Sequence, residues 1–325
     1  SFGPLGAKGF AFLNMLQLIG WTSIMIYDAM LALQELAPLS PIIWTIAIGA
    51  LVILWLFIGL HNTGYIQAIV SVLLLGLTLY MGAHMISQWP NEGIILTSGN
   101  MSFIAALELS IAMPLSWLPL ISDYTRESKK PFSASLTSAT VYTVTSIVMY
   151  TLGLSAAIFG GGDSIITIMM NAGLGLAGLI VIIFSTVTTT FMDAYSAGVS
   201  STTIYKSASS KGIAVVVTIV GTIAAILYPM DDITDFLYLI GSVFAPMIAI
   251  LLADYFINRQ QVQTLSAYLV RGLIWAVSVG LYHYMLHSES TIGATLPAFT
   301  MAFVVTAIVG FISHTENSSV EIKQH

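Results

Sequence analysis

The chain has 325 residues, of which 57% are hydrophobic and only 7% are charged, and its mean hydropathy is +0.92. Soluble domains carry roughly 25% charged residues, so this composition excludes a soluble globular protein and predicts an all-α integral membrane protein. The net charge of −6 includes no basic stretch suited to nucleic acid, and the absence of cysteine excludes disulfides and thiolate-bound metals.

Ten apolar segments follow one another along the chain, each suited to a bilayer span of about 20 residues. The connections between them are short and rich in turn-forming residues, and none has the composition of a linker between soluble domains. We therefore expect a single transmembrane domain over residues 1–325. The segments cover residues 9–33, 42–60, 64–87, 103–123, 133–159, 174–200, 212–229, 233–257, 268–286 and 292–313.

Basic residues indicate the orientation of these spans. With ten alternating spans, all nine lysines and arginines fall at one face, and the loops at the opposite face contain acidic residues instead. The positive-inside rule then predicts a multi-pass protein of the cell (inner or plasma) membrane with both ends of this chain in the cytoplasm. The basic residues are Lys8, Arg126, Lys129, Lys130, Lys206, Lys211, Arg259, Arg271 and Lys323; the acidic ones are Glu35, Glu92, Asp163, Asp231, Asp232 and Glu289.

The first span contains a polar stripe. Asn14, Gln17, Trp21 and Asp28 follow spacings of three, four and seven, so a helix places them on one face with Met25 beside them. Such a stripe suits the wall of a water-filled cavity, and the alternative is hydrogen bonding between neighbouring helices. Asp28 is an ionisable group inside a span and therefore a functional candidate, or else an interfacial residue near the outer end.

The segment 103–123 carries Pro114 and Pro119, which predict a kinked or broken helix, with Trp117 between them. Broken helices line the binding sites of many transporters, whereas the structural alternative is a proline-kinked span with an interfacial tryptophan. Glu108 lies one to two turns inside the outer face, where it is a functional candidate or a side chain that reaches the surface.

The sixth span, 174–200, contains the densest polar run at membrane depth. Ser185, Thr189 and Asp193 recur every four residues, and hydroxyl and carboxylate oxygens could coordinate a small cation or bind a polar solute. A lone carboxylate at this depth needs a proton, a cation or a hydrogen-bond donor. By contrast, we expect Asp123 and Asp254, at the ends of their spans, to lie at the cytoplasmic surface.

Four motifs, in this order along the chain, resemble those of the nucleobase–cation symporter family. They are LQLIGWTSIM (16–25), PLSWLPLISDYTR (114–126), TTTFMDAYSAG (188–198) and FAPMIAILLADYF (244–256). The resemblance covers essentially the whole chain and is strongest to the hydroxymethylpyrimidine transporters, which supply a thiamin precursor.

The resemblance implies a LeuT-like fold of twelve helices, with two inverted five-helix repeats and two peripheral helices. Residues 1–87 would then hold the last three helices of the first repeat, 103–257 the second repeat, and 268–313 the peripheral helices. On this reading ten of the twelve expected helices are present, and the chain is shortened at its N-terminal end by two.

The resemblance also implies roles for individual residues. Trp21 matches the family's substrate-stacking tryptophan, and Trp117 lies about three residues from the second stacking aromatic residue. Met25 occupies a position where some members have a base-binding glutamine, and Asp193 falls at a polar substrate-contacting position. Gln17, one turn before Trp21, completes the predicted substrate-binding set.

Thr188 best matches the hydroxyl ligand of the family's sodium site, with Thr189 next, while Glu108 and Asp28 remain candidates for proton or ion coupling. We therefore expect a monomeric secondary transporter that imports a pyrimidine-type solute with Na⁺ or H⁺ and needs no other cofactor. The alternatives are a cytosine, purine or allantoin permease, a membrane protein that binds without transporting, and a passive pore. Enzyme motifs are absent, so we do not expect an enzyme.

Overall fold

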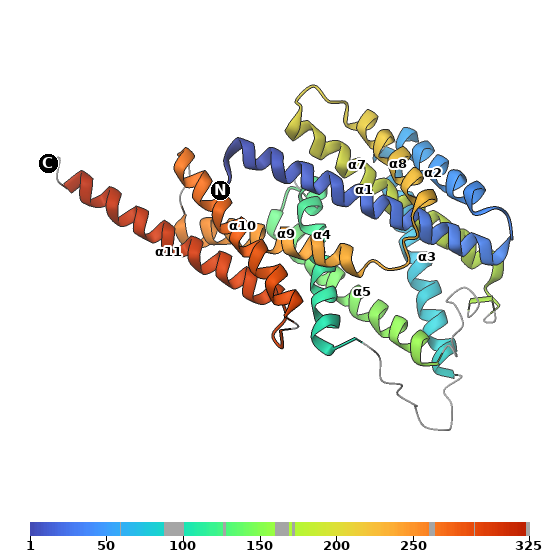
Figure 1. The fold of residues 1–325 in the computed structure, drawn as a ribbon. Helices are drawn as coiled ribbons and strands as arrows, with labels where there is room; N and C mark the ends of the chain where they lie inside the picture. Colours follow the sequence, from blue (N-terminus) through green and yellow to red (C-terminus); the bar gives the residue numbers. More distant parts are fainter. Residues whose placement is uncertain are drawn as a thin grey trace. The chain divides into compact units, whose positions relative to one another are not determined.

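The computed structural model describes residues 1–58, 60–87, 101–125, 128–159, 169–170, 173–259, 264–288 and 290–322. This part of the chain is helical and contains no strand, as predicted, and ten of its helices are long and apolar enough to cross a membrane (Figure 1). They are α1 (Gly3–Leu36), α2 (Pro41–Ile58), α3 (Leu60–Ser87), α4 (Phe103–Thr125), α5 (Pro131–Phe159), α7 (Gly175–Ile204), α8 (Ser210–Leu227), α9 (Thr234–Leu252), α10 (Leu265–His287) and α11 (Thr295–Ile322). A π-helix, η1 (Ala253–Asn258), continues α9.

Local chemistry explains several helix ends. Pro41 and Pro131 are the first residues of α2 and α5, where the N–H that proline lacks would have no helical partner. Ser209 and Thr264 cap α8 and α10 by accepting a backbone N–H of the first turn, at 3.1 and 3.4 Å. The predicted positions Arg126, Glu92, Asp163, Glu289 and Lys323 lie outside the described residues, as does the side chain of Asp123.

The break expected in the segment 103–123 is absent, because α4 continues through Pro114 and Pro119 as far as Thr125. Each proline removes one backbone donor, and a membrane helix tolerates this loss where protein surrounds the freed carbonyl groups. At the i→i−4 spacing of a helix, the prolines free the carbonyls of Ser110 and Leu115; the neighbouring Ser116 carbonyl accepts a side-chain hydrogen bond from Gln17 at 3.0 Å. The two prolines inside α4 therefore did not end this helix.

The chain divides into two compact units. The first unit comprises Ser1–Gln17, Gly99–Ile121 and Asp232–His325, and the second comprises Leu18–Ser98 and Ser122–Asp231. Helix α1 contributes to both, because the division falls within it.

The second unit is built around α2, α7, α8 and the later part of α1. On α8, Gly221 allows close approach, since a Cβ atom there would lie 2.7 Å from Cγ2 of Thr22 on α1. Helix α3 packs against both α5 and α7. The buried apolar centre consists of Ile26, Ala29, Leu33, Ile48, Leu179 and Ala225.

The first unit packs α9, η1, α10 and α11 against one another. Its apolar centre includes Ala249, Ile250, Ile274 and Ala302. Asp254 of η1 is buried beside it at 5% exposure, so the expectation that this acid lies at the surface is wrong. Arg271 of α10 donates to both carboxylate oxygens of Asp254, at 2.7 and 2.8 Å, which explains how the charge is accommodated.

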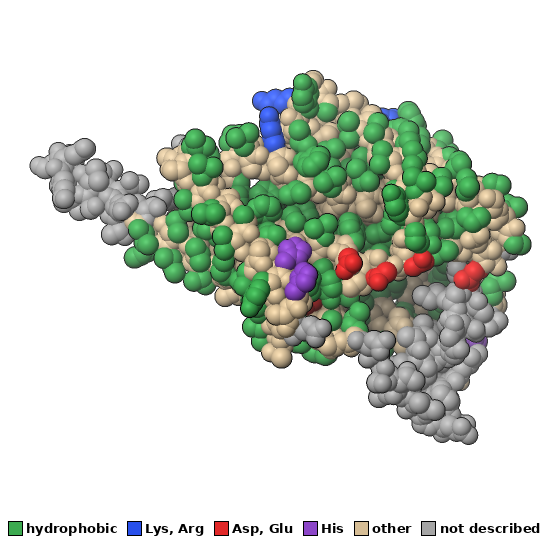
Figure 2. Space-filling view, in the orientation of Figure 1, with side chains coloured by type: hydrophobic (Ala, Val, Ile, Leu, Met, Phe, Trp, Pro, Cys, Tyr) green, Lys and Arg blue, Asp and Glu red, His purple; other side chains and the backbone are tan. Residues whose placement is uncertain are grey.

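Apolar side chains cover much of the face visible in Figure 2. Many large hydrophobic residues on the described helices are exposed, including Phe132 on α5, Leu73 on α3 and Leu273 on α10. Helices that satisfy their own backbone hydrogen bonds and carry exposed apolar side chains are suited to a lipid bilayer.

Candidate functional site

The polar stripe of α1 begins with a fixed pair in the first unit. Gln17 and Asn14 are both buried, at 4% exposure each. The Gln17 Nε2 group donates to the Asn14 Oδ1 atom at 2.7 Å and to the backbone carbonyl of Ser116 on α4 at 3.0 Å. The Gln17 Oε1 atom is buried and accepts no hydrogen bond from the described residues. The structure thus joins α1 to α4 and leaves one buried acceptor.

The rest of the stripe belongs to the second unit. Trp21 and Met25 are half-buried on α1, whereas Asp28 is exposed near the end of that helix. Its neighbour Tyr27 donates its hydroxyl to Asp231 at 3.2 Å, so this end of the stripe is a polar surface. An exposed Asp28 fits the interfacial alternative better than a buried coupling group.

Trp117 is half-buried on α4, in the first unit, next to the carbonyl that holds Gln17. Local sequence explains its position, because Pro114 and Pro119 flank it on one continuous helix. The contact between Gln17 and the Ser116 carbonyl could not be predicted from the sequence. Every residue carries a backbone carbonyl group, and only the fold determines which of them accepts the hydrogen bond.

Helix α7 carries the densest buried polar set, in the second unit. The hydroxyls of Thr188 and Thr189 both donate to the Ser185 carbonyl, at 3.0 and 2.8 Å, which leaves their oxygen lone pairs available. Asp193 is 5% exposed, and no hydrogen bond or ion pair within the described residues satisfies its carboxylate. A carboxylate in that environment is costly unless a proton, cation or donor meets it.

Thr190 is a buried polar residue that the sequence analysis did not select. It is fully buried, and its hydroxyl has no hydrogen-bond partner in the described part of the chain. It lies three residues before Asp193, so both share one face of α7. The three-residue spacing from Asp193 could have indicated Thr190. However, Thr190 is the last of three consecutive threonines, and the sequence alone gave no reason to prefer it over the other two.

Glu108 is buried on α4 and holds the start of α11, within the first unit. Its carboxylate accepts the backbone N–H groups of Ala294 at 3.2 Å and Thr295 at 2.9 Å, and also the Thr295 hydroxyl. Gly293 precedes them with φ +76°, and a Cβ atom there would collide with Glu108. These contacts satisfy Glu108 as a helix cap, which is sufficient reason for an acid at this depth.

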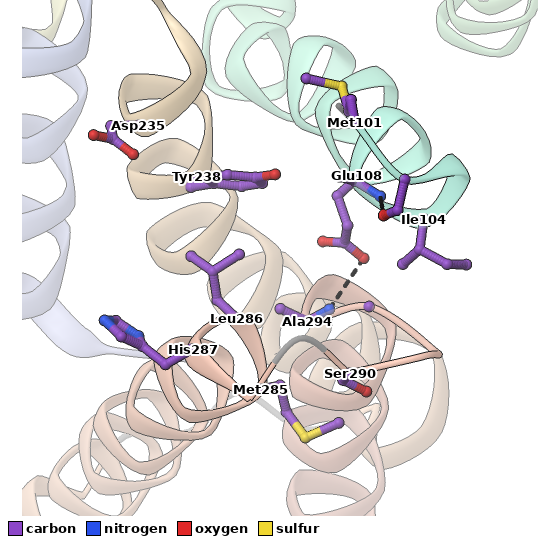
Figure 3. Close-up of a pocket in the computed structure, with 13 residues that line it drawn as sticks. Met101, Ile104, Glu108, Asp235, Tyr238, Met285, Leu286, His287, Ser290 and Ala294 are labelled. Carbon is purple, nitrogen blue, oxygen red and sulfur yellow. Dashed lines mark hydrogen bonds between the residues drawn. The ribbon is translucent and has the colours of Figure 1, made fainter. Parts of the chain in front are cut away.

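A cavity of about 740 Å³ lies beside this cap. In Figure 3, Glu108 reaches from α4 toward Ala294, while Asp235 and Tyr238 line the cavity from α9. None of Gln17, Trp117 or the residues of the second unit lines it. The cavity lining therefore contains none of the predicted substrate-binding residues.

Among the polar residues described above, the unsatisfied groups are acceptors or hydroxyls, whereas the buried indole N–H of Trp55 is an unsatisfied donor within the described part of the chain. Gln17 offers a carbonyl oxygen, Asp193 a carboxylate and Thr190 a hydroxyl. The described residues contain no cluster of three or more His, Cys, Asp or Glu side chains that could hold a metal ion. Each of these groups by itself suits a solute that donates hydrogen bonds or a small cation held by oxygen atoms.

Comparison with known proteins identifies the family. The family described as permeases for cytosine/purines, uracil, thiamine and allantoin matches residues 2–322, nearly the whole chain. This chain belongs to that family. The permease is therefore a multi-pass membrane transporter of the nucleobase type, and the family predicted from the four motifs is confirmed.

The fold is also confirmed. The permease is similar to the solved structure of Mhp1, a nucleobase-cation-symport-1 family transporter in a closed conformation with bromovinylhydantoin bound. The TM-score is 0.76 with 16% sequence identity, and the match covers 94% of this chain and 76% of that one. At this identity the similarity establishes the fold alone. No curated protein sequence matches the permease.

Proposed function

We propose that this permease imports a pyrimidine-type solute, hydroxymethylpyrimidine or a related nucleobase, in symport with Na⁺ or H⁺. The observation that carries the proposal is Asp193, a buried carboxylate without a partner among the described residues, on the most polar stretch of α7. Membership of the permease family supports transport as the activity.

The chemistry of a carboxylate favours an aminopyrimidine. An ionised carboxylate only accepts hydrogen bonds, and the exocyclic amino group of an aminopyrimidine donates them. The ring nitrogen of such a base can also take a proton, which would give a charge-assisted pair stronger than neutral hydrogen bonds. Uracil-like bases offer a carbonyl group in place of the amino group and would gain less from Asp193.

The remaining residues have complementary proposed roles. Trp21 and Trp117 would stack on the planar ring, Gln17 would contact its edge, and Met25 would fill apolar space beside it. A planar heterocycle bound near mid-membrane suits alternating access between two inverted repeats, 1–87 and 103–257. The helices within 268–313 would be peripheral to that movement.

The coupling ion has two proposed routes. Na⁺ would use the hydroxyl oxygens of Thr188 and Thr189, whose lone pairs remain available while both hydroxyls donate to Ser185. H⁺ would be carried by Asp193 itself, since protonation removes the cost of a buried charge. Glu108 and Asp28 are weaker candidates, because the first is engaged as a helix cap and the second is exposed.

Uptake by proteoliposomes containing the purified intact protein tests the proposal. Labelled hydroxymethylpyrimidine should accumulate above its external concentration when an inward gradient of Na⁺ or H⁺ is imposed, and not without one. Binding without accumulation would instead favour a binding protein, and equilibration independent of either gradient would favour a pore. Accumulation of a purine or allantoin in its place would favour a purine or allantoin permease, which the family description supports.

A further inference from the structure

The nitrogen and the oxygen of the Gln17 side-chain amide differ in their hydrogen bonding. Both N–H groups of its amide are committed, one to Asn14 at 2.7 Å and one to the Ser116 carbonyl at 3.0 Å. Its Oε1 atom is buried and has no donor among the described residues. Gln17 and its two partners belong to the first unit.

This arrangement fixes the direction of the amide. Rotation by half a turn would place the Gln17 oxygen against the Ser116 carbonyl, which can only accept. The Asn14 side chain could turn over to compensate, but a backbone carbonyl in a helix cannot. Ser116 and Asn14 therefore act as positioning residues, and Gln17 offers an acceptor only.

A buried acceptor without a donor is costly, and such groups are rare in folded proteins unless water, an ion or a ligand meets them. Methionine or leucine could fill the same space without this cost. A glutamine whose donors are used and whose acceptor is open is thus suited to recognising a donor on a bound molecule.

We propose that the Gln17 carbonyl oxygen accepts a hydrogen bond from an N–H group of the transported solute and so selects solutes that donate there. The inference rests on the proposed function and narrows it. A solute that presents a carbonyl oxygen or an unprotonated ring nitrogen at that position would meet another acceptor and bind poorly.

The test is a cycle that combines changes in the solute and the protein. Binding of cytosine and of its ring-methylated and amino-methylated derivatives is measured by calorimetry on the intact protein in nanodiscs. The N1-methyl derivative lacks the ring N–H donor, the N4,N4-dimethyl derivative lacks both donors of the amino group, and Gln17→Met removes the acceptor at nearly constant volume. Gln34→Met is the matched control, because Gln34 lies half-buried on the same helix and takes no part in the pair.

We expect methylation at one of the two donor positions to weaken binding of cytosine about tenfold in the wild type and in Gln34→Met. In Gln17→Met, the same methylation should change the affinity little. If Gln17→Met does not fold, Gln17→Asn replaces it in the test. Asparagine keeps an amide that can donate to the neighbouring groups, but its side chain is one methylene shorter, so its oxygen lies farther from the bound solute. Equal methylation penalties in wild type and in the Gln17 variant would overturn the inference and leave the proposed function intact. Failure of the wild type to bind cytosine, its derivatives and hydroxymethylpyrimidine would overturn both.

Discussion

Acids at membrane depth in this permease differ in whether the protein satisfies them. Glu108 accepts hydrogen bonds from three donor groups at the start of α11, and Asp254 accepts two hydrogen bonds from Arg271. Asp193 receives none within the described residues. Burial alone therefore does not identify a functional acid, whereas burial without a partner does so more selectively.

The first prediction concerns stacking by Trp21. An indole face on a planar heterocycle contributes about 1–3 kcal/mol by analogy with base–aromatic stacking. We expect Trp21→Ala to weaken solute binding about tenfold or more, and Trp21→Phe to retain part of the affinity. Equilibrium binding to the intact protein measures both. A costly Trp117→Ala beside a silent Trp21→Ala would show that the stacking role was assigned to the wrong tryptophan.

The second prediction concerns Glu108 as a helix cap. Glu108→Ala leaves two buried backbone donors and a hydroxyl without their acceptor, so the free energy of unfolding should fall by about 2–4 kcal/mol. Thermal unfolding of the purified protein measures this, with Glu35→Gln, an exposed acid, as the control. Unchanged stability in Glu108→Ala, together with loss of ion-dependent uptake, would restore Glu108 as a coupling residue.

The sequence favoured Asp193 as a functional acid, whereas Glu108 and Asp28 each had a structural alternative at the outer face or the membrane interface. Asp193 and Gln17, which residue type and helical spacing had selected, are both buried, and their roles stay predictions. The partners of Glu108 lie 187 residues away at Thr295, so no local pattern could reveal that this acid caps a helix. Orientation of the Gln17 amide was likewise set by Ser116, which is distant in sequence.

At the scale of elements, the end of α9 is tied to its neighbours by a buried polar network. Asn258 of η1 donates to Asp254 at 2.8 Å and to the Thr306 carbonyl of α11 at 3.1 Å, while Arg271 of α10 completes the network. The network joins three helices around a π-helical turn, a geometry that often marks a specific structural requirement.

The third prediction concerns this network. Arg271→Met leaves a buried carboxylate without its charge partner and should lower the free energy of unfolding by about 3–5 kcal/mol. The double variant Asp254→Leu/Arg271→Met removes both charges and should recover a large part of that loss. Denaturant unfolding in a single detergent measures all three proteins. A double variant no more stable than Arg271→Met would contradict a coupled ion pair.

Helices were predicted well because long apolar segments are a strong signal in membrane proteins. All ten expected spans correspond to helices, and Pro41 and Pro131 begin theirs as turn chemistry suggests. The break at Pro114 and Pro119 was not found, because surrounding protein decides whether a proline interrupts a helix. The π-helix at 253–258 carried no signal in its composition.

At the scale of the whole molecule, the distribution of basic residues gives the fourth prediction. Single cysteines at Lys129 and Lys206 should react with a membrane-impermeant reagent only from the cytoplasmic side, and those at Glu92 and Asp163 only from outside. The chain contains no cysteine, so each label reports a single position. A cytoplasmic signal from position 163 would overturn both the topology and the inverted-repeat arrangement proposed from it.

The most direct test of the account is the effect of Asp193→Asn on the choice of solute. Initial uptake rates of a labelled aminopyrimidine are measured in proteoliposomes while unlabelled amino- and oxopyrimidines compete. Since an amide both donates and accepts, the account predicts that affinity for the aminopyrimidine falls while affinity for the oxopyrimidine holds or rises. Equal loss of affinity for both, together with loss of ion dependence, would assign Asp193 to the coupling ion and contradict its role in solute selection.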